Sequence, residues 1–146
     1  MLRARGWVAA PIDEVFAFFD DPRNLARLTP PPARIELVRI EPDPPRRGSE
    51  LEFRYGMGPI TRRWVVRLLE HDPPHRMVDE TLSGPMRQFR HEHRFRAGRH
   101  GTWIEDRIEY RVGPGGPLGV AVDAAAGLAM RALLVYRHAM ARRIFG

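Results

Sequence analysis

Length, composition and charge place this chain among ordinary globular proteins. Of its 146 residues, 43% are hydrophobic and 29% are charged, which suits one hydrophobic core. Cysteine is absent, and this excludes disulfides, thiolate metal sites and cysteine nucleophiles. The formal net charge of +6 at pH 7 leaves an RNA- or ribosome-associated module open. The arginines are spread along the whole chain without a recognition motif, however, so a nucleic-acid partner is disfavoured.

Targeting signals and domain boundaries leave few marks on the sequence. Near the start, Arg3 and Arg5 lead directly into Trp7 without the apolar stretch of a signal peptide. We find no apolar run of about 20 residues that would span a bilayer, and we predict a cytoplasmic protein. The linker-like segment Gly113–Pro117 is too short to separate two domains. Residues 1–146 are therefore expected to form a single domain, as a monomer or a homodimer.

The chain opens with a predicted strand and two short helices. Residues 2–10 suit a strand, and Pro11 stands where the first turn of a helix tolerates proline. Apolar residues then recur at the spacing of one helix face, at Ile12, Val15, Phe16 and Phe19. A second short helix is expected around residues 24–28, before a run of prolines.

Period-two alternation predicts a sheet for the middle of the chain. Six strands follow, separated by proline and glycine turns, at residues 35–41, 50–57, 60–70, 76–83, 87–97 and 102–112. Residues 118–145 lack proline and favour one long helix. The predicted fold class is α+β, with a seven-stranded curved antiparallel sheet, two short helices after the first strand and a long C-terminal helix packed over a cavity.

A helical wheel divides the long helix into two sides. The side predicted to face the sheet holds Val122, Ala125, Ala129, Ala132, Leu133, Tyr136 and Met140. The opposite side holds Asp123, Arg131, His138 and Arg142. We therefore expect alanine, leucine and tyrosine side chains to line the cavity, and the charged side chains to point to solvent.

The pairing register of the hairpin at residues 88–111 can be derived from its charged residues. Pairing Gly98 with Gly101 creates three opposite-charge pairs, Arg94 with Glu105, Glu92 with Arg107 and Arg90 with Glu109, and sets Arg96 against Trp103. Sliding the strands by two residues in either direction sets like charges opposite one another. The charged face is thus predicted to be a solvated ladder.

The same register predicts the inner face of the hairpin. There Phe89, His91, His93 and Phe95 face Tyr110, Ile108, Asp106 and Ile104 respectively. Two interpretations of this polar group remain open, because a buried polar side chain needs a partner. Either His93 and Asp106 satisfy each other in the core, or the two histidines, Asp106 and Tyr110 line a pocket and orient the polar end of a ligand.

Other groups of residues give weaker evidence for a functional site. The alternation of His91, Glu92 and His93 offers two metal ligands on one strand face, and a third would have to come from Asp106 or from another strand; this pattern is weak, and we predict no metal and no cofactor. The two serines lack a nucleophile-elbow pattern. Arg62 shares a strand face with Trp64, and either meets an acidic ligand group near the cavity mouth or lies on the rim in water.

Several short sequence segments are similar to those of a known superfamily. Residues 11–20 with 22–25 resemble the first helix pair of the START and Bet v 1-like superfamily, also called SRPBCC or polyketide cyclase/dehydrase-like. Residues 84–95 and 101–110 resemble its bacterial ligand-binding branch, and Tyr136–His138 resembles the end of that branch's helix. The resemblance covers essentially the whole chain and implies a helix-grip fold with a pocket between sheet and helix.

The resemblance implies binding of a small hydrophobic or amphipathic molecule, such as a lipid, quinone or polyketide-like compound, by a carrier or sensor. The candidate ligand-binding residues are Phe53, Tyr55, Arg62, Trp64, Phe89, His91, His93, Phe95, Ile104, Asp106, Ile108, Tyr110, Ala129, Leu133 and Tyr136. The alternative is a cyclase or dehydratase. In that enzyme His93, held by Asp106, is the general base, and Tyr110 or His91 stabilises an enolate oxygen.

Overall fold

The secondary structure follows the predicted order closely. In the computed structural model, which describes residues 1–146, the elements in chain order are strand β1 (Leu2–Val8), helix α1 (Ile12–Asp20), 3₁₀ helix η1 (Pro22–Leu28), strands β2 (Ala33–Glu41), β3 (Glu50–Met57), β4 (Ile60–Asp72), β5 (Arg76–Ser83), β6 (Gln88–Ala97) and β7 (Thr102–Arg111), and helix α2 (Gly116–Phe145). Asp21 begins η1 by accepting a hydrogen bond from the Arg23 backbone N–H at 3.0 Å.

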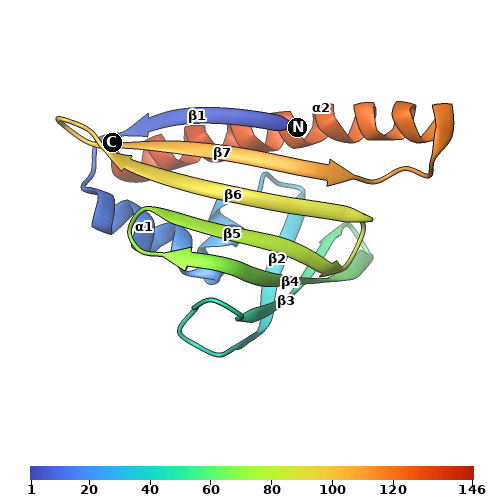
Figure 1. Ribbon diagram of the computed structural model, residues 1–146, viewed down its shortest axis with the longest axis horizontal. Helices are drawn as coiled ribbons and strands as arrows, with labels where there is room; N and C mark the ends of the chain where they lie inside the picture. The colour runs from blue at the N-terminus through green and yellow to red at the C-terminus, as the bar shows by residue number, and fades with distance from the viewer.

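All seven strands belong to one antiparallel sheet in the order β1-β7-β6-β5-β4-β3-β2. The first strand therefore pairs with the last, which places Leu2 near the N-terminus opposite Ile108 near the end of β7. Helix α2 runs along β1 and β7 on one face of the sheet, and α1 lies on that same side at one end (Figure 1). The predicted α+β helix-grip architecture is confirmed.

The hairpin register is also confirmed, with Arg94 opposite Glu105 and His93 opposite Asp106. The predicted charge ladder is wrong in its partners, because it considered the two hairpin strands alone. Strands β1 and β5 flank the hairpin and supply closer partners. The guanidinium of Arg5, on β1, lies 4.2 Å from the ring centre of Trp103, where Arg96 was expected.

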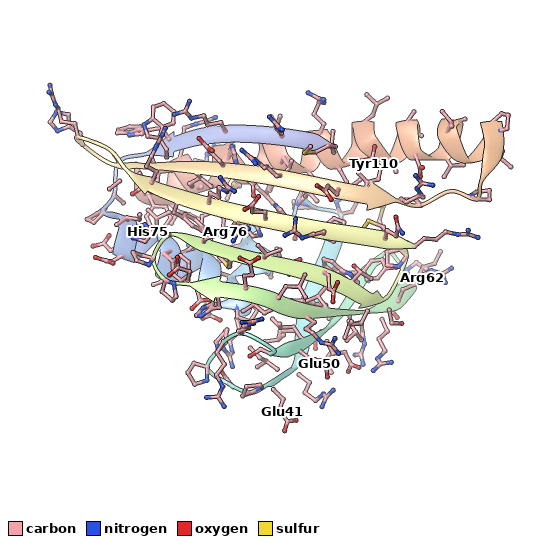
Figure 2. The ribbon with its side chains drawn as sticks, in the orientation of Figure 1. Glu41, Glu50, Arg62, His75, Arg76 and Tyr110 are labelled. Carbon is pink, nitrogen blue, oxygen red and sulfur yellow. The ribbon has the colours of Figure 1, made fainter.

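Glu92 shows the same effect on the other flank. It was expected on a solvated face, yet it is only 5% exposed. Its carboxylate accepts hydrogen bonds from Nε of Arg76 on β5 at 2.5 Å and from Nε of Arg94 at 2.8 Å. Arg76 lies on the sheet face that carries no helix (Figure 2), so arginine side chains cover the carboxylate there.

The predicted orientation of the long helix is wrong. Its buried residues are Gly119, Gly127, Leu134, His138 and Ala141. Ala125, Ala129 and Ala132 are exposed instead of facing the sheet, while His138 is buried instead of exposed. The helix is apolar on most of its circumference, so the wheel gave little contrast. The better signal is glycine, since a missing side chain marks the side where a helix approaches its neighbour closely.

Gly127 illustrates that close approach. A Cβ atom at this position would lie 2.2 Å from the hydroxyl oxygen of Tyr110 on β7. The same hydroxyl donates a hydrogen bond to the backbone carbonyl of Asp123 at 2.8 Å. The carboxylate of Asp123 in turn accepts hydrogen bonds from the backbone N–H groups of Val112 and Gly113. Tyr110 and Asp123 thus join the first half of α2 to the end of β7.

The length and composition of α2 also correct the statement that no segment is apolar enough to span a bilayer. Residues Gly116–Phe145 meet that description. In this fold the helix packs across the sheet as the core helix of the domain, with its outward face exposed.

We expect Gly127→Ala to lower the free energy of unfolding by about 1–3 kcal/mol, because the added methyl group collides with the Tyr110 hydroxyl. In a Tyr110→Phe background the colliding atom is gone, and Gly127→Ala should be neutral or stabilising through its better helix propensity. Urea denaturation of the four proteins measures both effects. Equal destabilisation in the two backgrounds would show that the contact does not limit the helix position.

Candidate functional site

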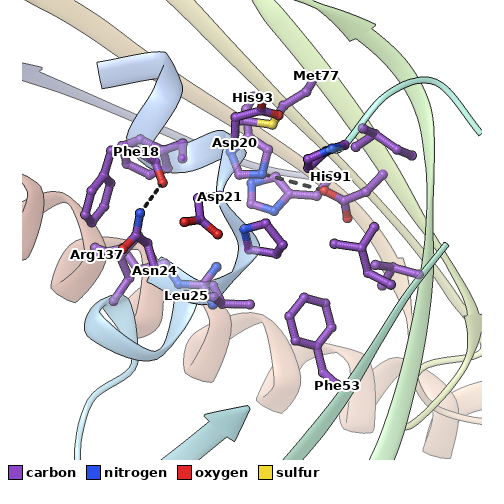
Figure 3. A pocket seen from close by; sticks show the side chains of 18 of the residues that line it. Phe18, Asp20, Asp21, Asn24, Leu25, Phe53, Met77, His91, His93 and Arg137 are labelled. Atoms are coloured by element: carbon purple, nitrogen blue, oxygen red, sulfur yellow. Dashed lines mark hydrogen bonds and ion pairs between the residues drawn. The ribbon is translucent and has the colours of Figure 1, made fainter. Parts of the chain in front are cut away.

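Two adjoining hollows lie between the sheet and α2. The outer cavity, of about 460 Å³, is lined mainly by Tyr55, Met57, Ile60, Arg62, Trp64, Met86, Phe89, Ile108, Met130, Leu133 and Leu134. The inner pocket, of about 110 Å³, lies deeper, among α1, η1 and the middle strands (Figure 3). Trp64, His91 and Arg137 line both. The outer cavity therefore adjoins a smaller pocket whose walls combine apolar side chains with a cluster of charged and polar ones, and we call it the polar pocket for that cluster.

The carboxylate of Asp106 is the centre of the polar pocket. It comes from β7, is 4% exposed, and meets three histidines. Nε2 of His91 donates to its Oδ1 at 2.8 Å, and Nε2 of His138 donates to its Oδ2 at 2.6 Å. Nδ1 of His93 lies 2.9 Å from Oδ1, in a direction that makes an ion pair but not an aligned hydrogen bond. One carboxylate thus links β6, β7 and α2.

Local sequence explains how these side chains converge. His91 and His93 are two residues apart on β6 and so point to the same side of the sheet. His138 reaches Asp106 past Gly6 of β1, where a Cβ atom would lie 2.7 Å from its Nδ1. Glycine at position 6 therefore leaves the space that the α2 histidine occupies.

The environment separates the protonation states of the two β6 histidines. Burial alone would lower the pKa of His93, but the carboxylates of Asp106 and Asp79 raise it to about 9. Burial and the neighbouring charge on His93 lower the pKa of His91. Burial would raise the pKa of Asp106, but its three histidine partners hold it well below its usual value. At neutral pH the pocket holds a carboxylate, an imidazolium and a neutral imidazole.

Arg137 of α2 also lines the inner pocket, and its label lies near those of Phe18 and Asn24 in Figure 3. Its Nε is buried and makes no hydrogen bond. Burial lowers the pKa of Arg137, and the charges of Asp106 and Asp79 offset this effect only in part. A guanidinium held in this way is an uncompensated donor that faces the cavity.

Most of the predicted site residues lie in the cavity walls. The inner pocket or the outer cavity is lined by Phe53, Tyr55, Arg62, Trp64, Phe89, His91, His93, Asp106, Ile108 and Leu133. Arg62 is exposed and belongs to the rim, near the start of β4 (Figure 2). Of the two interpretations of the polar group, the first named His93 as the partner of Asp106, but His91 and His138 make the hydrogen bonds and His93 contributes an ion pair. His91, His93 and Asp106 line the inner pocket, and their orienting of a ligand stays a prediction.

Five predicted residues do not line either hollow. Phe95 and Ile104 belong to the hydrophobic core beneath α1, together with Val15 and Phe16. Tyr110 is occupied with the Asp123 carbonyl. Ala129 lies on the exposed side of α2, and Tyr136 also misses the cavities, because the helix is rotated from its predicted orientation.

Three residues that line the inner pocket escaped the sequence analysis, namely Asp79, Arg137 and His138. Asp79 pairs in register with His91 across β5 and β6, which requires the second hairpin register to be known. Gly119, Gly127 and Leu134 follow one another along α2 at spacings of eight and seven residues, which return to the same helix face, and His138 lies four residues beyond Leu134 on that face, with Arg137 beside it. Glycine spacing was therefore the available signal.

Asp79, His91 and His93 have the residue types of a cation site, since their ligand atoms lie within 4.8 Å of one another. Their charges are already engaged, however. Two carboxylates, Asp79 and Asp106, face two cations, the imidazolium of His93 and the guanidinium of Arg137. A divalent cation would enter beside these positive charges, so we assign no metal to the pocket.

Comparison with known proteins agrees with this architecture. Residues 8–134 match the family described as polyketide cyclase / dehydrase and lipid transport. No curated protein is significantly similar in sequence. A solved structure from Rhodobacter sphaeroides has a TM-score of 0.77 at 20% identity, covering 98% of this chain and 90% of the other.

Two further solved structures show the same fold. A protein from Chromobacterium violaceum has a TM-score of 0.74 at 14% identity, over 99% of this chain and 96% of the other. Ara h 8.0201 has a TM-score of 0.67 at 12% identity, over 96% and 95%. At these identities the likeness concerns the fold alone.

The His93 imidazolium should make stability pH-dependent. Its folded pKa of about 9 lies above the ordinary value of 6.5, so its contribution is fully present below about pH 6.5 and is lost as the pH rises through 9. We expect His93→Gln to cost on the order of 3 kcal/mol at pH 6 and much less at pH 9.5. Chemical denaturation at both pH values tests this, with the exposed loop residue His100 changed to Gln as control. A cost independent of pH would contradict the assignment.

Proposed function

Because this chain belongs to the polyketide cyclase/dehydrase and lipid transport family, we propose that it binds a small hydrophobic or amphipathic molecule, of lipid, quinone or polyketide-like kind, as a carrier or sensor. The observation that supports this most directly is the outer cavity of about 460 Å³. Its size falls in the range of small-molecule sites, and its lining is predominantly apolar with a few convergent polar groups at the inner end.

The lining of the outer cavity suits an apolar ligand of variable shape. Met57, Met86 and Met130 contribute flexible thioether side chains, which adapt to different apolar surfaces. At the mouth, Met57 and Ile60 are 58% and 63% exposed. A ligand that covers such side chains removes their apolar surface from water. This burial stabilises the complex by about 25 cal/mol per Å².

The polar pocket supports a binding role over the catalytic role considered from sequence. A general base must be unprotonated near the working pH, yet the carboxylates of Asp106 and Asp79 raise the pKa of His93 to about 9. Tyr110 cannot serve as the enolate donor, since its hydroxyl points to α2 and donates to Asp123. The set of His93 as base and Tyr110 as donor is therefore not supported.

A second candidate function rests on the contrast between His91 and His93. Their ring centres are 3.7 Å apart, and their surroundings shift their pKa values in opposite directions. Such a divided pair can supply a base and an acid. With Nε2–H of His91 donated to Asp106, its Nδ1 carries the lone pair of a base, and His93 is the acid. This exchanges the roles expected from the sequence.

The binding proposal predicts that a bulky residue in the outer cavity blocks the ligand. We expect Leu133→Trp to weaken binding of the neutral dye Nile red by about tenfold or more, because the indole occupies the cavity. Ala132→Trp, on the exposed side of the same helix turn, is the matched control and should leave affinity within about twofold. Fluorescence titration measures both, and native mass spectrometry with organic extraction identifies a co-purifying ligand. Unchanged binding by Leu133→Trp would exclude the outer cavity as the site.

The enzymatic candidate predicts proton abstraction beside a carbonyl group. We expect the protein to accelerate exchange of the α-protons of 2-decanone for deuterium, followed by NMR in D₂O, and His91→Phe to remove the acceleration while Nile red still binds. Wild-type protein that exchanges no faster than buffer would eliminate this candidate and leave the binding role.

A further inference from the structure

The charged lining of the outer cavity has one sign only. Three arginines, Arg34, Arg62 and Arg137, take part in it, and no aspartate or glutamate does. Arg34 and Arg62 are exposed or partly exposed at the mouth, whereas Arg137 lies where the cavity meets the inner pocket. A hollow with walls of low polarity and one sign of charge focuses its electrostatic potential on ligands of the opposite sign. The cavity is thus electrostatically suited to an anion.

The innermost of these arginines has no partner within the chain. Arg34 donates a hydrogen bond to the Gly58 carbonyl, but the buried Nε of Arg137 makes none. No carboxylate oxygen forms an ion pair with Arg137, although Asp106 and Asp79 are near enough to act on its charge. Desolvating a guanidinium without hydrogen-bond partners is costly, and a bound anion would supply the missing acceptors.

A carboxylate suits this place better than a phosphate. The guanidinium fork matches the two oxygens of a planar carboxylate. The inner pocket, of about 110 Å³, leaves room for only a small group. The carboxylates of Asp79 and Asp106 line it as well, and they would repel a doubly charged phosphate more strongly than a monoanion.

We propose that the protein binds an amphipathic monocarboxylic acid, with its apolar body in the outer cavity and its carboxylate paired with the guanidinium of Arg137. This inference rests on the proposed binding function and names the class of ligand. Trp64 and His91, which line both hollows, flank the junction where carboxylate and apolar body meet.

Decanoic acid and decanol form a matched pair of probes with the same chain and different head groups. We expect wild-type protein to bind the acid about tenfold to a hundredfold more tightly than the alcohol, as measured by displacement of Nile red at pH 7.5. This is the range expected for hydrogen bonds to a charged group. Equal affinity for acid and alcohol would overturn the carboxylate assignment, while displacement by both would still support the binding function.

The residue assignment is tested with Arg137→Gln, which keeps hydrogen-bonding capacity but removes the charge and the fork. We expect it to lose the preference for the acid while its affinity for decanol stays within about twofold. Arg131→Gln is the control, because Arg131 lies exposed on the same helix and lines neither hollow. Equal weakening of acid and alcohol by Arg137→Gln would assign Arg137 a structural role and overturn the proposal.

Thermal unfolding of the ligand-free proteins separates loss of fold from loss of recognition. Since burial of the guanidinium is offset only in part, Arg137→Gln should unfold at the same temperature as wild type or higher. A clear fall in Tm would argue that the chain itself satisfies Arg137. If Nile red does not bind wild-type protein at all, the proposed function fails and the carboxylate inference fails with it.

Discussion

The arrangement of this protein depends on one buried carboxylate. Asp106 lies within 3 Å of nitrogen atoms from His91, His93 and His138, and so connects two neighbouring strands with the helix that crosses them. A buried carboxylate is tolerated only when donors satisfy its oxygens. His91 and His138 donate hydrogen bonds to them and His93 adds an ion pair, and the bond from His138 fixes the second half of α2 on the sheet. Gly6 is the complementary requirement, because only a residue without a side chain leaves room for His138.

The region around Asp106 also contains buried donor groups that have no hydrogen-bond partner. His91 and His138 hydrogen-bond to the carboxylate of Asp106, whereas Nδ1 of His93 is paired with it by charge alone. Arg137, one residue before His138, has a buried Nε without a partner. Its place on the helix beside His138 brings the side chain to the pocket wall, where it is partly exposed. Unmatched polar groups of this kind tend to mark functional sites. A protein that carries this cost without a ligand gains stability when a suitable anion binds.

The hairpin shows how far local rules reach. The register of β6 and β7 could be derived because alternating charge and apolar residues make any slip of two residues unfavourable. The register gave the contact of His93 with Asp106 correctly. It did not give the partners of the outward side chains, because Arg5 and Arg76 come from β1 and β5. The order of strands in the sheet determines which distant parts of the sequence flank the hairpin. The alternation pattern carries no information about that order.

By itself, the sequence determined the order and type of the elements, the hairpin register and the presence of polar side chains on an apolar inner face. Those features follow from periodicity, turn residues and cross-strand charge, which are local. Only the tertiary structure decided the rotation of α2, and with it the entry of Arg137 and His138 into the pocket and the exclusion of Ala129 and Tyr136. The helix is apolar nearly all round, so its own pattern favours no side, and its orientation comes from contacts with Asp106, Tyr110 and Gly6.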